Sequence, residues 1–120
     1  MSERYEVPDD LLYTKEHEWV RQEKKKYAVV GITDYAQRKL REIIYIELPH
    51  LNTKVRTRDV LGTVESVKST ADIFSPVSGK VVEVNSTLLD HPEMLNESPY
   101  NDGWIAKVEL SDQAELDKLM

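Results

Sequence analysis

Residues 62–85 read GTVESVKSTADIFSPVSGKVVEVN, and this stretch decides the fold. It contains short runs of β-branched and apolar residues, which are typical of strands. The runs on the two sides of Lys68, residues 63–67 and 69–73, can pair with each other around a tight turn. The stretch therefore predicts a hairpin that carries a single lysine at its tip.

Short strands with close turn signals are predicted along the rest of the chain. Residues 19–22 and 27–33 form a second hairpin around the lysine run 24–26. Asp34, with Gln37 three residues later, predicts the capping box of a short helix, and Asp112 caps a terminal helix. Residues 88–102 are expected to be a loop, and further strands are expected at 43–48, 60–67, 73–75, 80–84 and 104–110. This pattern predicts an all-β barrel or sandwich with two or three short helices.

The bulk composition limits the possible functions. The chain has 120 residues, of which 40% are apolar, so we expect residues 1–120 to form one domain. The start, MSERYEVPDD, lacks the features of a signal or transit peptide, and no apolar run reaches the length of a membrane span. We therefore expect a cytoplasmic, prokaryotic protein without a membrane partner. The net charge of −6 disfavours nucleic acid, because phosphate binding needs a concentrated basic face.

Sites for catalysis or for metal binding are not predicted. The chain has no cysteine, and the three histidines, His17, His50 and His91, lack the spacing of metal ligands. The serines near the lysine have no histidine close in sequence that could activate them as nucleophiles. We therefore expect neither a metal site nor nucleophilic catalysis.

Lys68 itself has two interpretations. The simpler one is a solvated turn lysine, which is protonated and inert. The other is an acylated lysine, because a modifying enzyme needs a primary amine held clear of the protein body, and acylation converts the side chain into a long uncharged arm. The residues alone leave both interpretations open.

A family resemblance favours the second interpretation. The segment around Lys68, together with KEHEWV (15–20), VGITDYAQ (30–37), IYIELP (44–49) and NESPYNDGWIAKV (96–108), is similar to the glycine cleavage system H proteins, in the same order. The resemblance implies a barrel-sandwich hybrid fold, as in lipoyl and biotinyl carriers, with lipoate in amide linkage to Lys68. Glu65, Ser66 and Val67 complete the ESVK motif, which implies that they are recognised with the attachment hairpin.

The function that the resemblance implies is that of a carrier. A lipoyl arm would receive the aminomethyl group of glycine from a pyridoxal-phosphate glycine decarboxylase (P protein) and deliver it to an aminomethyltransferase (T protein). Dihydrolipoyl dehydrogenase (L protein) would then reoxidise the arm, and lipoate-attaching enzymes would install it on a monomeric carrier. The alternatives are a lipoyl carrier or lipoate relay of another pathway, and a biotinyl or unmodified interaction module.

A cleft for the loaded arm is also implied by the resemblance. Its matching positions are Glu18 and Asp72, whose carboxylates would hold the cationic amine, and Ile32, which would form an apolar wall. The alternative is that both acids are ordinary solvated carboxylates. Glu16 lies where some relatives carry a small hydroxyl residue.

Three positions depart from the family pattern. Arg41, Asn52 and Arg58 stand where we expect glycine in a backbone conformation with positive φ. Asparagine tolerates that conformation, whereas arginine is strained in it. We therefore expect altered loop geometry at Arg41 and Arg58.

Overall fold

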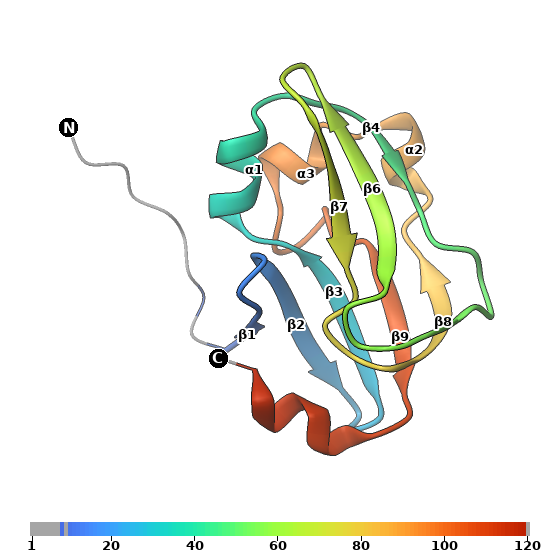
Figure 1. Cartoon of the computed structure of the whole chain (residues 1–120). Coiled ribbons are helices and arrows are strands. Elements are labelled where there is room, and N and C mark those ends of the chain that lie inside the picture. Colours follow the sequence, from blue (N-terminus) through green and yellow to red (C-terminus); the bar gives the residue numbers. More distant parts are fainter. Residues whose placement is uncertain (1–7, 9, 120) are drawn as a thin grey trace.

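The computed structural model describes residue 8 and residues 10–119, which form two β-sheets with short helices at their ends (Figure 1). The strands are β1 (Leu12–Tyr13), β2 (Glu18–Glu23), β3 (Tyr27–Ile32), β4 (Ile43–Glu47), β5 (Lys54–Val55), β6 (Val60–Ser66), β7 (Thr70–Phe74), β8 (Gly79–Val84) and β9 (Ala106–Leu110). The helices are α1 (Asp34–Leu40), α2 (Thr87–Asp90), α3 (Met94–Glu97) and a terminal 3₁₀ helix, η1 (Gln113–Lys118). No helix in this described part of the chain has the length and hydropathy needed to cross a membrane.

The two sheets differ in size and in strand order. The larger sheet has the order β1-β2-β3-β9-β8-β5, and the smaller one has the order β4-β6-β7. The chain enters the smaller sheet twice, first through β4 and then through the β6–β7 hairpin, which lies in front of the larger sheet in Figure 1. The tip of that hairpin extends over the end of the molecule where α1 and α3 lie. Both predicted hairpins are therefore present.

The main core fills the space between the two sheets. Val20 and Val30, which are paired across β2 and β3, point into it and meet Ile46 and Val64 of the smaller sheet. The alternation of the strands places Trp19 and Val29 on the opposite face of the larger sheet. The period-2 pattern of the sequence thus corresponds to two buried layers.

The outer layer is built around Trp19. The indole is fully buried, its Nε1–H donates to the carbonyl of Pro99 at 2.9 Å, and Tyr100 packs beside it. The residue opposite Trp19 on β3 is Gly31, and a Cβ atom there would lie 2.5 Å from the indole carbons. Glycine at this position is therefore required by the close approach of the tryptophan. Through Pro99 and Tyr100, Trp19 thus holds the connection between β8 and β9 against the larger sheet.

Two sequence-based expectations about helices were wrong. Residues 88–102 were expected to be a loop but contain most of α2 and all of α3. Each of these helices has only four residues, so neither shows a periodic pattern that a sequence reveals. The N-cap of α1 is Thr33 instead of Asp34, because the Thr33 hydroxyl accepts from the Ala36 amide at 3.1 Å. Asp34 lies inside the first turn, where Gln37 donates to its carboxylate.

The expected change of loop geometry at Arg41 and Arg58 was also wrong. Both residues keep the positive φ angles that suit glycine, 70° and 79°, and Asn52 has a φ of 68°. Arg41 ends α1 with a ψ of −151°, in a region that is almost exclusive to glycine. Both arginines therefore adopt strained, glycine-like backbone conformations instead of relaxing to negative φ.

This strain predicts that Arg41→Gly stabilises the protein. A non-glycine residue in that region costs about 1–3 kcal/mol, and the greater freedom of glycine in the unfolded chain returns about 0.5–1 kcal/mol. We expect the free energy of unfolding, measured by urea denaturation, to rise by about 1 kcal/mol. Arg56 provides the matched control: it is exposed and has no positive φ, so Arg56→Gly should lower the same quantity. A loss of stability in Arg41→Gly would contradict the assignment of strain.

Candidate functional site

Lys68 occupies the turn that joins β6 to β7. The last paired residues of the hairpin are Glu65 and Thr70, so the turn projects beyond the ladder. Lys68 is exposed, and within the described part of the chain its amine takes part in no hydrogen bond or ion pair. The amine is therefore available for modification without breaking a contact of the fold.

Ser66 fixes the backbone of this turn from inside. Its side chain is buried, and its Oγ accepts from the amides of Lys68 at 3.1 Å and Ser69 at 3.0 Å. The hydroxyl donates to the Ser69 carbonyl at 3.1 Å, and the Ser66 amide donates to the same oxygen at 2.8 Å. The flexible lysine side chain thus starts from a rigid backbone. The sequence had assigned Ser66 to recognition, and the geometry makes it a support of the turn.

A second anchor ties the turn to the connection between α1 and β4. The Val67 amide donates to the carbonyl of Glu42 at 3.0 Å, and Ile43 at the start of β4 pairs with Ser66. The turn is therefore held on two sides, by its own hairpin and by the segment that follows α1. The sequence pattern contained no signal for this anchor, because the two segments lie about 25 residues apart in the chain.

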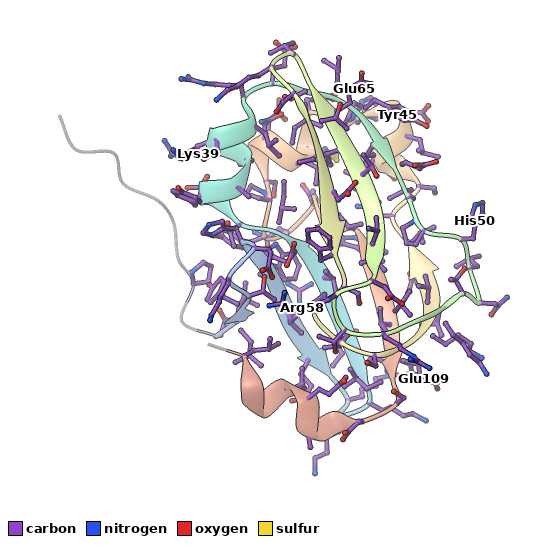
Figure 2. All side chains as sticks on the ribbon, in the orientation of Figure 1. Lys39, Tyr45, His50, Arg58, Glu65 and Glu109 are labelled. Carbon is purple, nitrogen blue, oxygen red and sulfur yellow. The ribbon has the colours of Figure 1, made fainter. Side chains whose placement is uncertain are left out.

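Exposed apolar side chains lie next to the turn on the β4 side. Val67 is 64% exposed, Tyr45 is 51% exposed and Ile44 is 49% exposed. Tyr45 pairs with Glu65 across β4 and β6, and both side chains project near the hairpin tip (Figure 2). Glu65 and Val67, expected to be recognised with the hairpin, are thus both accessible, and Tyr45 is a neighbour that sequence reasoning missed.

Glu18 occupies a very different environment. Only 2% of the residue is exposed, and its carboxylate accepts from the Thr14 hydroxyl and, at 3.2 Å, from the Phe74 amide of β7. Glu18 is on β2, so this carboxylate connects the larger sheet to the smaller one. Burial raises the pKa of Glu18, although the hydrogen bonds from Thr14 and Phe74 act in the opposite direction.

The structure brings two of the three predicted cleft residues together. Ile32 is buried and lies directly opposite Glu18 across β3 and β2, so both side chains point towards the inner core. Asp72 is exposed on β7, where its carboxylate accepts from the Thr63 hydroxyl at 3.3 Å. Asp72 is thus on the same strand as Phe74, the amide partner of Glu18, two residues away.

Glu18 also lines a cavity of about 230 Å³ between the β1–β2 connection and residues 57–58. Among the described residues, neither Asp72 nor Ile32 lines it. Arg58 and Glu16 do line it, and they form an ion pair: Arg58 Nη2 lies 3.8 Å from Glu16 Oε2. The side chains of Arg58 and Glu16 thus form a charged pair in the same cavity as Glu18.

A larger cavity, of about 630 Å³, lies between the tip of the β6–β7 hairpin and the helices α1 and α3. Lys68 lines it together with residues of α1 and of α3, the latter including Asn96, and with Arg41 and Glu42 of the connection between α1 and β4. The described residues that line it are polar or charged, although the stems of their side chains contribute much of its surface. Across the described residues, no group of three or more histidines and acids is arranged to hold a metal ion.

Comparison with known proteins identifies the family. A family model described as "Glycine cleavage H-protein" matches residues 11–120 of the chain. This chain belongs to the glycine cleavage H-protein family. The glycine cleavage system H protein of Carboxydothermus hydrogenoformans is 48% identical over 114 residues, which cover 95% of this chain and 87% of that protein. The H protein of Oceanobacillus iheyensis is 50% identical over 114 residues, which cover 95% and 90% of the two chains.

A solved structure supports the same conclusion. The crystal structure of a glycine cleavage system H protein from Mycobacterium marinum superposes with a TM-score of 0.84 at 33% identity, covering 88% of this chain and 87% of that one. The predicted all-β class is confirmed, and the two sheets are consistent with the barrel-sandwich hybrid of this H-protein family. The role of a lipoyl carrier in glycine cleavage follows from membership of the family.

The raised pKa of Glu18 predicts how stability changes with pH. The folded protein binds the Glu18 proton more tightly than the unfolded chain, in which the pKa is near the ordinary value of 4.5. The stability of the wild type relative to Glu18→Gln should therefore be greatest below pH 4.5 and should fall as the pH rises through the raised pKa. Urea denaturation of both proteins across this range measures the difference. A difference that grows with pH would contradict the desolvation of Glu18.

Proposed function

We propose that Lys68 is the residue that carries the lipoyl group, within a single carrier domain formed by residues 1–120. The observation that carries this proposal is the turn itself: an exposed amine without a partner among the described residues, on a backbone that Ser66 and Glu42 hold in place. Attachment would form an amide between Lys68 Nζ and the carboxyl carbon of lipoate, while one carboxyl oxygen leaves with the group by which the attaching enzyme activates it and the amine releases its protons. The dithiolane of that group supplies the redox chemistry and the point of attachment for the one-carbon cargo.

The contribution of the protein is position and protection. The turn presents Lys68 to lipoate-attaching enzymes and then to the P, T and L proteins in succession, and the chain supplies no catalytic residue. Glu65, Val67 and Tyr45 form the accessible surface beside the lysine, so they are the side chains that these enzymes would contact. We propose that the carrier acts as a monomer in the cytoplasm of a prokaryotic cell.

Glu18 and Asp72 are proposed to hold the cationic amine of the cargo. The Glu18 carboxylate is poorly solvated, so a cation in the neighbouring cavity would gain a strong interaction and would favour the ionised form of the acid. Asp72 offers a second, exposed carboxylate on β7. Ile32, opposite Glu18, limits access of water from the core side.

Replacement of the lysine tests the attachment site. We expect the intact mass of the wild type, produced in cells that attach lipoate, to carry the lipoyl increment, and Lys68→Arg to lack it. Lys80→Arg is the matched control, because Lys80 lies on β8 and should not affect the increment. A lipoylated Lys68→Arg variant would exclude the site, and a biotinyl increment would exclude the cofactor.

Reconstitution tests the pathway. The lipoylated wild type, mixed with a competent pyridoxal-phosphate glycine decarboxylase, should support exchange of carbon dioxide with glycine. Arg41 and Arg58 have positive φ angles, the conformation that suits glycine, so their backbone angles give no reason to expect a different partner set. A lipoylated chain that fails in this exchange would instead favour a carrier or lipoate relay of another pathway.

The amine-holding proposal predicts faster loss of cargo when either acid is neutralised. A hydrogen bond to a charged group contributes about 1.5–3 kcal/mol, so Glu18→Gln should raise the rate of hydrolysis of the loaded carrier by about tenfold or more. Asp72→Asn should produce a smaller increase, because Asp72 is exposed to water. The release of formaldehyde and ammonia measures the rate, and Asp90→Asn on α2 is the control. Rates equal to that of the wild type in both variants would remove the acids from the site.

A further inference from the structure

Both polar atoms of the Asn96 side-chain amide form hydrogen bonds, and these bonds join α3 to α1 and to the connection between α1 and β4. Its Oδ1 accepts from the Ile43 amide at 2.9 Å. Its Nδ2 donates to the carbonyl of Arg41 at 2.7 Å and to Gln37 Oε1 at 3.0 Å. One side chain thus clamps the residues on both sides of Glu42.

Glu42, between these two residues, is the one that holds the lysine turn. Its carbonyl accepts the Val67 amide at 3.0 Å, one residue before Lys68. Asn96 and Lys68 also line the same 630 Å³ cavity. Two hydrogen-bonded steps therefore connect the Asn96 amide with the backbone that carries the lysine.

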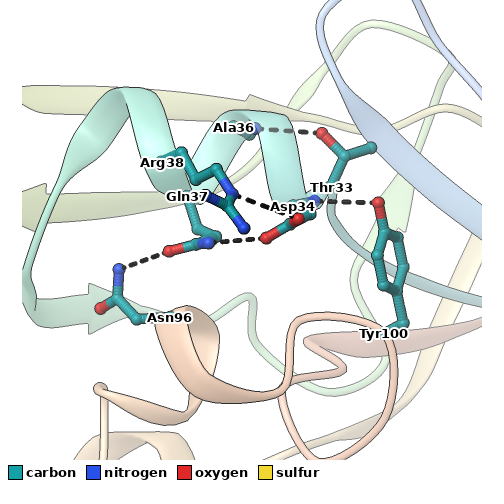
Figure 3. Close-up of polar contacts among 7 residues, drawn as sticks. All are labelled: Thr33, Asp34, Ala36, Gln37, Arg38, Asn96 and Tyr100. Carbon is teal, nitrogen blue, oxygen red and sulfur yellow. Dashed lines mark hydrogen bonds and ion pairs between the residues drawn. The ribbon is translucent and has the colours of Figure 1, made fainter. Parts of the chain in front are cut away.

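The orientation of the Asn96 amide is fixed by a chain of polar contacts (Figure 3). Gln37 accepts from Asn96 through Oε1, so its Nε2 is free to donate to Asp34 Oδ1, at 2.7 Å. The Asp34 amide in turn donates to the hydroxyl of buried Tyr100 at 2.9 Å. A flipped Asn96 amide would place its Nδ2 against the Ile43 amide, donor against donor, so only one orientation satisfies the chain.

The clamp acts on a backbone that would otherwise relax. Arg41 has a φ of 70° and a ψ of −151°, a conformation that arginine avoids, and the hydrogen bond from Asn96 to its carbonyl opposes relaxation. A change of these angles would move Glu42 and, with it, the acceptor of the Val67 amide. The position of the turn therefore depends on Asn96.

We propose that Asn96 is a positioning residue for the modification of Lys68. It keeps residues 41–43 in the geometry that holds the lysine turn ready for a lipoate-attaching enzyme. This inference rests on the proposed attachment at Lys68. When only a fraction of the carrier has a correctly placed turn, the apparent affinity of the enzyme falls by that fraction. Loss of the clamp should therefore raise KM for the carrier and leave kcat unchanged.

The variant Asn96→Asp removes the clamp with little change of shape. The acceptor for the Ile43 amide remains, but an oxygen replaces Nδ2 and opposes the Arg41 carbonyl and Gln37 Oε1. The assay uses the full-length unmodified carrier with a lipoate protein ligase, ATP and lipoate. We expect KM for the carrier to rise by about tenfold, which corresponds to a correctly placed turn in one molecule in about ten. Hydrogen exchange at the Val67 amide should accelerate in the same variant.

Asn85→Asp is the matched control. The Asn85 side chain also bridges two backbone carbonyls, those of Asp102 and Trp104, both at 2.8 Å, but it follows β8 and binds the segment before β9. This variant should lose a comparable amount of stability and keep the KM and the Val67 exchange rate of the wild type. A general loss of stability would raise KM equally in both variants, and that result would overturn the proposal.

The remaining outcomes distinguish failure of the positioning role from failure of attachment at Lys68. A folded Asn96→Asp variant with the KM of the wild type would overturn the positioning role and leave attachment at Lys68 intact. A wild type that the ligase never modifies at Lys68 would overturn both. If Asn96→Asp fails to fold, Gln37→Leu takes its place, because it removes the side-chain partner that orients the Asn96 amide and so weakens its hydrogen bonds to Arg41 and Ile43. Its KM should rise by about threefold, and an unchanged KM would overturn the proposal.

Discussion

The hydrogen bond from the Val67 amide to the Glu42 carbonyl is the contact on which the presentation of Lys68 depends. A two-stranded ribbon that projects from a sheet is only marginally stable by itself. Here the end of the ribbon is tied back to the body of the protein one residue before the lysine, and Ser66 fixes the turn from inside. The side chain of Lys68 can move freely because its backbone cannot. A carrier needs this combination, since its arm must travel while its partners recognise a constant surface.

A second constraint, the buried carboxylate of Glu18, connects the same hairpin to the larger sheet at its other end. Glu18 accepts from the Phe74 amide, which lies at the end of β7. Desolvation makes the ionised carboxylate costly, as the raised pKa records, and the two hydrogen bonds offset part of this cost. A purely structural link between the sheets would not require an ionisable group. A poorly solvated acid next to a cavity supports the proposed role of Glu18 in holding a cation.

The sequence predicted those features that depend on local pattern. Alternation of apolar residues located both hairpins, and the single lysine between strand-like runs located the turn. The family resemblance assigned Glu18 and Ile32 to the same cleft, and in the structure they are neighbours across β2 and β3. The helices α2 and α3 were missed because four residues are too few for a period to appear. Asn96 was missed for a different reason: its three partners, residues 37, 41 and 43, lie more than 50 positions away, and only the folded chain brings them together.

Arg41, Asn52 and Arg58 have positive φ angles, although arginine by itself prefers negative φ. At these positions, backbone hydrogen bonds outweigh the conformational preference of the residue. In all three residues the backbone amide donates to a backbone carbonyl: Arg41 to Gln37 at 3.0 Å, Asn52 to Val81 at 2.7 Å and Arg58 to Ser75 at 2.7 Å. An arginine that relaxed to negative φ would turn its amide away from that acceptor. Loss of a hydrogen bond, with its acceptor left unsatisfied, costs about as much as the strain itself. The backbone conformation at these three positions is therefore set by the carbonyl acceptors and not by the local preference of the side chain.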